Sequence, residues 1–330
     1  MQVRQTRRAI VVGVAALPLR PLWAQAADGA VVAFAGSTVR FASVETARSS
    51  LAADDEWLRA AGPFNLRVIM GRSDAVSKED FRRWVVSAAM PWPEDQRQRW
   101  TRAFQALAPG WNALRIPLPP EVLLVGTTGQ EQSGAPHTRG QGIMVPVGFK
   151  AGAAAEDAWL MAHELWHVVS RLVPDLATRL YAEIGFEPIP PLVYPEAWAP
   201  IRLANPDAPE HRHAMRLKIG GREALVTPVL VAARTELKPG ETFFNVLDVR
   251  LLEVQPDGPV SRAVMRDGQP VWYPVKGDHD YLKRLGGNTG YVIHPEETMA
   301  DNVALLATQR PAPNAELLAR LRAVFEARSR

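Results

Sequence analysis

Apolar residues recur at helical spacing near the middle of the chain. Over residues 154–173, one helix face is formed by Trp159, Ala162, Trp166, Val169 and Val173. Pro174 follows directly, and a residue that precedes proline is biased away from the helical conformation. The pattern predicts one continuous helix over 154–173, and we interpret its tryptophans as core residues.

The first third of the chain alternates between short apolar runs and amphipathic stretches. Ser77 is followed three residues later by Asp80, a spacing similar to a capping box that predicts the start of a helix. The expected strands span 31–34, 38–44 and 66–70, and the expected helices span 45–60, 77–90 and 93–107. These elements predict a mixed α/β N-terminal part over residues 27–120.

A second group of apolar runs precedes the central helix. Residues 121–126 and 142–149 are predicted strands, and a Gly-rich polar loop separates them. Pro146 lies in the second run, and proline is tolerated on edge strands. Residues 143–146 are therefore predicted to form a sheet edge beside the central helix, where an extended peptide could add as a further strand.

The pattern changes twice after the central helix. Prolines are dense over 188–209, which argues against regular structure there. Residues 216–273 alternate with a period of two or are continuously apolar, and glycine-containing turn signals separate the runs, so a β-rich insertion is expected. Helices ending near residues 307 and 327 are predicted to close the chain. The predicted fold class is α+β.

The central helix carries the sequence His163-Glu164-Leu165-Trp166-His167. Residues four apart on a helix lie on one face, about 5–6 Å apart at Cβ, so both imidazoles can reach one metal ion. Glu164 lies between them, where it could act on a bound water. Zinc accepts imidazole nitrogen and, in catalytic sites, keeps one position open for water. We therefore expect a zinc site with Glu164 as its catalytic base.

A third protein ligand is required, and the best candidate is Glu297. Pro295 marks the start of its helix, and Asp301 lies four residues further along the same face, beside Ala300 and Ala304. Small residues allow a second helix to approach closely. Glu297 is therefore expected to reach the metal, and Asp301 to accept the free N–H of a ligating histidine.

Glu183 is the alternative third ligand. It lies on the helix that is predicted to begin at Pro174, where an acidic residue is ordinarily a solvated charge. Glu187 also follows the motif at a plausible spacing, but Gly185 and Pro188 would break any helix around it. Glu297 therefore remains the preferred ligand at this point.

The H-E-x-x-H motif followed by E-x-x-x-D from Glu297 to Asp301 resembles the gluzincin branch of zinc metallopeptidases, to which thermolysin belongs. The form E-x-x-A-D is similar to that of CAAX-protease-like gluzincins. The resemblance implies a zincin-like catalytic domain over residues 121–330 that acts on peptide or protein substrates. It also implies that His163, His167 and Glu297 bind Zn²⁺. It covers two helices, and the two motifs lie about 130 residues apart, farther than in compact members.

In such a site, zinc lowers the pKa of its bound water to roughly 7, and Glu164 takes a proton as the water attacks a carbonyl. The resulting oxyanion needs a donor besides the metal. Tyr291 and His294 lie nearest the Glu297 helix in sequence and are candidate donors. The expected function is a zinc-dependent metallohydrolase, most simply a peptidase. The alternative is a non-catalytic zinc-binding or scaffold protein of the cell envelope, whose closed site would fill the fourth position with protein.

Residues 1–26 have the pattern of a signal peptide. Three arginines occur among the first eight residues, an apolar run spans 9–17, and Ala24-Gln25-Ala26 fits a cleavage site. The run is shorter than the roughly 20 residues that a membrane span needs, so no stable membrane span is expected after signal removal. Export by the general secretory or twin-arginine route to the periplasm or the medium is expected for either function.

Removal of this segment changes the charge of the chain. The full sequence has a formal charge of +3, and residues 1–26 hold four arginines and no acidic residue, so the remainder carries −1. No basic cluster with interleaved aromatic residues appears later, and nucleic-acid binding is not expected. The chain contains no cysteine, which excludes disulfides, thiolate metal ligands and cysteine catalysis.

Overall fold

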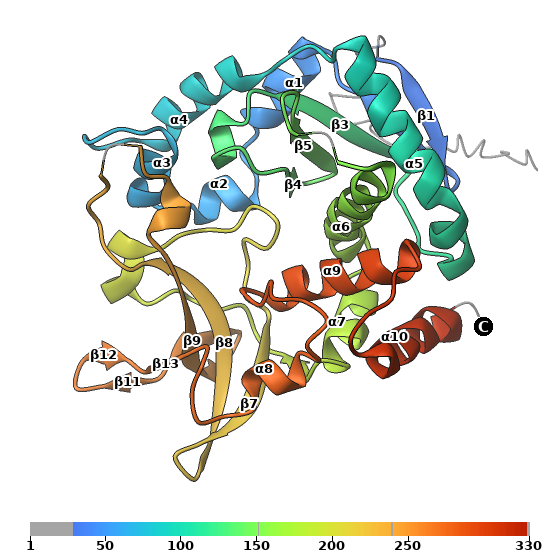
Figure 1. Cartoon of the computed structure of the whole chain (residues 1–330). Coiled ribbons are helices and arrows are strands. Elements are labelled where there is room, and N and C mark those ends of the chain that lie inside the picture. The colour runs from blue at the N-terminus through green and yellow to red at the C-terminus, as the bar shows by residue number, and fades with distance from the viewer. Residues whose placement is uncertain (1–28, 151, 239, 329–330) are drawn as a thin grey trace, which may run out of the picture.

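A computed structural model describes residues 29–328 except 151 and 239. The predicted signal peptide therefore lies outside the described residues. Two large β-sheets, one two-stranded sheet and a group of packed helices occur in the described part of the chain (Figure 1). The combination agrees with the predicted α+β class. Among the described residues, no helix is both long and apolar enough to cross a membrane.

The first sheet has five strands in the order β1-β2-β3-β5-β4. Strands β2, β3 and β5 run parallel, and β1 and β4 pair antiparallel at the two ends. The bounds are Val31–Phe34 (β1), Ser37–Phe41 (β2), Glu121–Thr127 (β3), His137–Arg139 (β4) and Gly142–Pro146 (β5). The continuous apolar run of β3 suits a central strand that is buried on both faces. The sequence pattern predicts a boundary at residue 120 between an N-terminal part and a catalytic domain. The first sheet joins these two parts, because β2 pairs with β3.

The expectation that residues 143–146 form the sheet edge is wrong. Strand β4 pairs outside β5, with Thr138 opposite Ile143, so the edge is made by three residues that the sequence placed in a loop. The sequence His-Thr-Arg has too few residues to show a period of two, and it contains no apolar side chain that would indicate a strand. The edge strand still precedes the central helix in the chain.

Five helices separate β2 from β3. They are α1 (Val44–Leu51), α2 (Glu56–Ala60), α3 (Pro63–Ile69), α4 (Lys78–Val85) and α5 (Glu94–Leu114). The capping box that was predicted from Ser77 and Asp80 is confirmed at the start of α4.

Two predictions in this region are wrong. The helix expected over 45–60 is two helices, because the side chain of Asp55 caps α2 by accepting the N–H of Leu58 at 2.9 Å. The strand expected over 66–70 lies within α3, which begins at Pro63. Proline at the first helical position favours a helix, and the apolar run that follows was too short to distinguish strand from buried helix.

The second sheet confirms the expected β-rich insertion. Its strand order is β10-β9-β8-β7-β6, and β13 also pairs with β9. The bounds are Phe186–Pro188 (β6), His213–Ile219 (β7), Arg222–Ala232 (β8), Leu247–Asp257 (β9), Val260–Ala263 (β10) and Trp272–Pro274 (β13), and a separate hairpin is formed by Met265–Arg266 (β11) and Gln269–Pro270 (β12). Apolar residues from the end of β8, such as Leu230, share a hydrophobic core with α1 to α4.

The remaining helices are α6 (Ala154–Leu172), α7 (Pro174–Ala182), α8 (Tyr281–Arg284), α9 (Pro295–Ala307) and α10 (Ala315–Arg328). Of these helices, α6 lies against β4 and β5 of the first sheet, and α7 contacts β6 of the second. Helix α9 lies against α6, α5 and α7, and every residue of α9 except Leu305 is buried. Burial on all sides means that the polar side chains of α9 must find partners inside the protein.

Gly110 allows the close approach of α5 to α9. A Cβ at this position would lie 1.8 Å from the carbonyl oxygen of Ala307. In an exposed helix, alanine in place of glycine would stabilise the fold by up to about 1 kcal/mol. Here the clash must be relieved by moving one helix against the other, and overpacking of this kind costs about 1–3 kcal/mol.

We therefore predict that Gly110→Ala lowers the free energy of unfolding by about 1–2 kcal/mol, measured by urea denaturation. Gly148→Ala is the matched control, because no other atom lies within 4 Å of the added Cβ; it should leave stability within about 0.5 kcal/mol. A Gly110→Ala protein as stable as the control would contradict the close packing of α5 on α9.

Candidate metal centre

The two histidines of the motif project from one face of α6. Their ring centroids lie 4.9 Å apart. The Nε2 atoms of His163 and His167 lie 3.3 Å and 3.5 Å from the same oxygen, Oε2 of Glu297 on α9. All three residues are buried, and together they form a group that could hold a metal ion. The structure thus brings the predicted ligand set together from segments about 130 residues apart.

A separate carboxylate holds the other ring nitrogen of each histidine. Nδ1 of His163 lies 2.8 Å from Oδ1 of Asp301, and Nδ1 of His167 lies 2.7 Å from Oε1 of Glu296. Nδ1–H donation to a carboxylate leaves the lone pair of Nε2 directed at the shared centre, as in carboxylate–histidine–metal sites. Asp301 has the position that was predicted for it. Glu296 was missed.

Glu296 is held in place by three donors. Its Oε1 also accepts a hydrogen bond from Oγ of Ser170 at 2.7 Å, and its Oε2 accepts one from the hydroxyl of Tyr181. Burial alone would raise the pKa of Glu296, but these bonds and the contact with His167 lower it below the ordinary value. The carboxylate therefore stays ionised inside the protein. Its position next to Glu297 on a helix was the available signal, since adjacent residues can flank the same centre.

Two polar atoms at this centre have no hydrogen-bond partner among the described residues. They are Nε2 of His167 and Oε2 of Glu297, both fully buried. Burial raises the pKa of Glu297, but the electrostatic attraction of His167 and His163 outweighs it and holds the pKa at about 2. A buried anionic oxygen facing an unpartnered imidazole nitrogen is costly unless a cation lies between them.

Glu164 lies next to this centre and points away from solvent. Its Oε2 accepts a hydrogen bond from Oγ1 of Thr138 on β4 at 2.8 Å. Burial raises the pKa of Glu164 to about 7, against the opposing effects of His163 and Thr138. A carboxyl group with this pKa can take up and release a proton near neutral pH.

A further acidic residue, Asp207, reaches the site from the proline-dense segment. Glu164, His167 and Asp207 offer ligand atoms that all lie within 4.8 Å of one another. Burial is the main cause that raises the pKa of Asp207 to about 8. No pattern in the sequence indicated this residue, because segment 188–209 has no periodicity from which its position could be predicted.

The alternative third ligands are excluded by their positions. Glu183 forms an ion pair with Arg320 of α10 at 2.9 Å, and Glu187 pairs with Arg216 at 2.8 Å. Neither belongs to a group of described residues that could hold a metal ion. Glu183 has the solvated role that such a position ordinarily implies.

The two candidate donors are placed differently. The ring of Tyr291 lies nearly parallel to that of His163, with centroids 6.1 Å apart, and its side chain is part-exposed. His294 caps α9: its Nδ1 accepts the N–H of Glu296 at 3.1 Å. Burial lowers the pKa of His294 to about 4, so the ring is neutral at pH 7. Tyr291 is therefore better placed than His294 to meet a substrate.

The start of α6 is anchored by a buried ion pair. Arg99 of α5 binds Asp157 through two hydrogen bonds of 2.6 Å and 2.8 Å. The same guanidinium donates to the carbonyl oxygens of Phe149 and Lys150, in the segment that leads into α6. These contacts fix the direction of the helix that carries the histidines.

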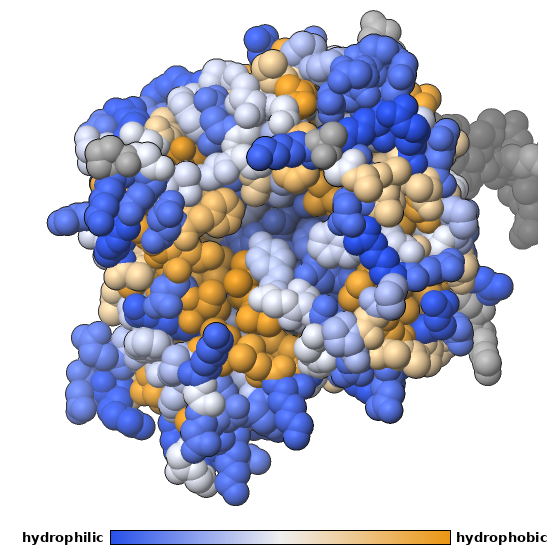
Figure 2. All heavy atoms as spheres, viewed as in Figure 1, coloured by the Kyte–Doolittle hydropathy of each residue, from blue (hydrophilic) through white to orange (hydrophobic). Residues whose placement is uncertain are grey.

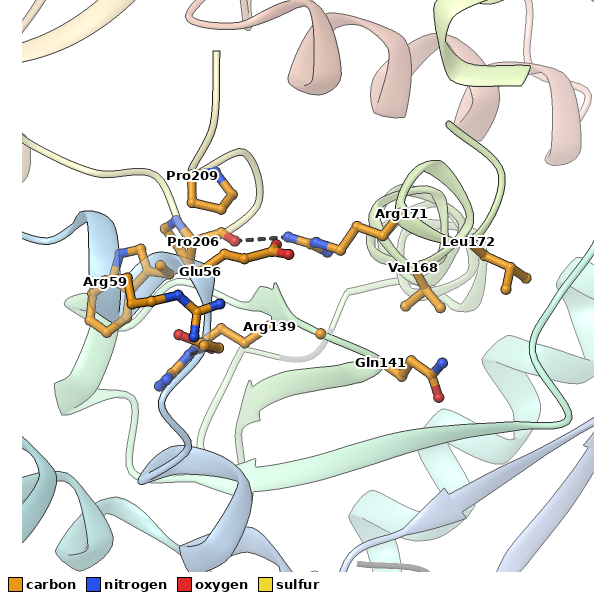
Figure 3. Close-up of a pocket in the computed structure, with 12 residues that line it drawn as sticks. Glu56, Arg59, Arg139, Gln141, Val168, Arg171, Leu172, Pro206 and Pro209 are labelled. Carbon is orange, nitrogen blue, oxygen red and sulfur yellow. Dashed lines mark hydrogen bonds and ion pairs between the residues drawn. The ribbon is translucent and has the colours of Figure 1, made fainter. Parts of the chain in front are cut away.

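A cavity adjoins the C-terminal end of the motif helix. The face drawn in Figure 2 is hollowed near its centre, where hydrophilic residues lie beside hydrophobic ones. This cavity of about 380 Å³ lies between α2, the β4–β5 turn and the C-terminal end of α6, and Figure 3 draws residues that line it. Val168 and Arg171 line it from α6, so the cavity begins beside the motif helix.

Comparison with known protein families, with curated proteins and with solved structures found no match. The arrangement of the site therefore carries the functional argument. What it contains is a buried His, His, Glu group with carboxylate partners behind each histidine and a further carboxyl group, Glu164, beside it.

We predict that the purified protein, dialysed against buffer with a divalent metal, retains one equivalent per chain. His167→Ala should lower the affinity by at least about 100-fold, since loss of even an outer partner costs 10–100-fold. Glu183→Ala is the control and should bind as the wild type does. Affinity is measured by competition with a chromophoric chelator, after circular dichroism has shown that each variant is folded. Equal affinity of the His167→Ala variant would contradict the assignment.

Proposed function

We propose that the protein is a zinc-dependent hydrolase, and specifically a peptidase. The observation that carries the proposal is the buried triad of His163, His167 and Glu297 with the carboxyl group of Glu164 beside it. A metal site that only stabilised the fold would have no need of a further carboxyl group, Glu164, that does not belong to the triad. The proposal includes the export signal in residues 1–26 and a peptide or protein substrate outside the cytoplasm.

The spacing of the ligand atoms supports zinc. Bonds of about 2.1 Å at tetrahedral angles place two ligand atoms roughly 3.4 Å apart, and the two Nε2 atoms lie 3.3 Å and 3.5 Å from Oε2 of Glu297. Two imidazole nitrogens and one carboxylate also match the ligand types of catalytic zinc. Calcium and magnesium prefer sites made of oxygen ligands.

Glu164 is the residue that would move the proton. Zinc bound at the triad would lower the pKa of a bound water to roughly 7 and polarise a substrate carbonyl. The Glu164 carboxylate accepts a proton from the attacking water and then delivers it to the leaving amine nitrogen. Thr138 holds Oε2 of this carboxylate and so fixes its orientation during both transfers.

Tyr291 would stabilise the oxyanion. Its ring lies beside His163 at the part-exposed side of the site, and its hydroxyl makes no hydrogen bond to any other described residue. Tyr181 and Tyr281, in contrast, donate to Glu296 and to the carbonyl oxygen of Val292. Of these three tyrosines, Tyr291 alone has a hydroxyl that is free to donate to a substrate oxygen.

The surrounding fold supports a zincin-like core. A sheet whose short edge strand, β4, precedes the motif helix lies against that helix, and Thr138 of β4 contacts Glu164 directly. The downstream helix α9 supplies the third ligand, as the resemblance to gluzincins implies. The β-rich insertion accounts for the long separation of the two motifs.

We predict that Glu164→Gln retains zinc and loses hydrolysis of a fluorescence-quenched peptide library by about 10²–10⁴-fold. Glutamine keeps the shape and the hydrogen bond from Thr138 but cannot accept the proton. Glu183→Gln, the surface control, should retain full activity. A Glu164→Gln protein that cleaves as fast as the wild type would show that the mechanism is wrong, and the non-catalytic zinc-binding role would then be favoured.

Tyr291→Phe should lower kcat by about 10²–10³-fold and leave KM nearly unchanged, because the hydroxyl would contribute only when negative charge develops. Zinc affinity should not change, since the phenol is not a ligand. Tyr281→Phe is the control: it removes a buried hydroxyl away from the centre and should affect stability more than kcat. An effect of Tyr291→Phe on KM alone would assign the residue to substrate binding.

A further inference from the structure

Residues 203–209, which we call the strap, cross the site from the proline-dense segment. The strap begins on firm anchors: the N–H of Leu203 donates to the carbonyl oxygen of Leu230 at 3.1 Å, and the carbonyl oxygen of Ala204 accepts from Nε1 of Trp57 at 3.0 Å. In Figure 1 this part of the chain, coloured yellow, runs between α2 and the α6–α9 pair. Further along the strap, Asn205 and Asp207 reach residues of the metal centre.

Asp207 of the strap binds the main chain of the edge strand, β4. The main-chain N–H of Thr138 donates to Oδ1 of Asp207 at 2.6 Å. The carbonyl oxygen of Thr138 accepts from Arg171 at 3.3 Å. Both main-chain groups of Thr138 that a peptide would need for strand addition are therefore bound by side chains of the same protein.

The strap also contacts the metal ligands. Nδ2 of Asn205 donates to Oε1 of Glu297, the oxygen that does not face the histidines. The carboxylate of Asp207 has an oxygen within 4.8 Å of ligand atoms of both His167 and Glu164. Oδ2 of Asp207 accepts no hydrogen bond from another described residue, so it is free to coordinate a cation.

The side chain of Arg171 on α6 forms hydrogen bonds with both the strap and β4. Its guanidinium donates to the carbonyl oxygen of Pro206 at 2.8 Å (Figure 3). It also donates to the carbonyl oxygens of Asp207 and His167, each at 2.9 Å. One side chain thus joins the strap, the edge strand and the motif helix.

We propose that the strap is an autoinhibitory element and that Asp207 is a displaceable fourth ligand of the metal. With Asp207 bound, the metal has four protein ligands and no open position for water, which is the arrangement of a structural rather than a catalytic site. The same strap blocks strand addition at Thr138. Hydrolysis then requires residues 205–207 of the strap to move away from the metal centre. This single movement frees both the fourth coordination position and the main chain of the edge strand.

The surroundings allow such a movement. Two cavities of about 380 Å³ and 240 Å³ adjoin the strap, and Pro209 and Arg171 line both. Residues 205–207 are held by side-chain hydrogen bonds rather than by a sheet or a helix, while the anchors at 203–204 would stay in place. This inference rests on the proposed metal-dependent function.

The test uses the full-length protein loaded with Co²⁺, whose visible absorption reports on the ligands of the metal. Asp207→Ala should change the absorption spectrum relative to the wild type. It should also let acetohydroxamate, a small bidentate metal ligand, bind at least tenfold more tightly, because the position is open. Asp175→Ala, an exposed aspartate on α7, is the matched control and should behave as the wild type does.

A second variant separates the strap from the ligand. Arg171→Met keeps Asp207 but removes the hydrogen bonds that hold the strap to α6 and β4. This variant should bind acetohydroxamate more tightly than the wild type and hydrolyse the peptide library several-fold faster. Identical spectra and identical acetohydroxamate affinities for wild type, Asp207→Ala and Arg171→Met would overturn the strap proposal and leave the hydrolase proposal standing. Failure of the wild type to bind Co²⁺ would overturn both. Tighter acetohydroxamate binding by the two variants without any hydrolysis would support the strap and reject the hydrolase.

Discussion

The contact between α6 and α9 is the constraint on which the site depends. It buries three carboxylates of α9 against two histidines of α6, away from the water that would otherwise solvate them. Charges in such a place persist only when each has a partner. Asp301 and Glu296 each face one of the two Nδ1 atoms, and Glu297 faces both Nε2 atoms at the candidate metal centre.

Two arginines hold the two ends of α6. Arg99 fixes the start of the helix through Asp157, and Arg171 fixes its end through main-chain carbonyl oxygens of the strap and of β4. The helix is thus held at both ends by guanidinium groups with several bonds each, a geometry that suits arginine better than lysine. Ligands carried on a helix held in this way keep their spacing, which metal binding and catalysis both require.

Thr138 contacts both the proposed catalytic base, Glu164, and the residues that cover the edge strand. Its hydroxyl orients Glu164, while its main-chain N–H and carbonyl oxygen are occupied by Asp207 and Arg171. A change in the strap would therefore reach the proposed base through a single residue. The β-rich insertion contributes to this arrangement because its Leu230 anchors the strap and shares a hydrophobic core with the N-terminal helices.

Local patterns in the sequence were sufficient for the motif helix, for the capping box at Ser77, for the β-rich insertion and for the pairing of Glu297 with Asp301, because each depends on residues within a turn or two of one another. They were misleading at 66–70 and at the sheet edge, where short segments carry no reliable period. Glu296 and Asp207 depended on tertiary structure alone. They lie in chain segments 40 to 130 residues away from the motif. These segments come together because buried charges need partners across the packed helices, and local spacing in the sequence does not reveal such partners.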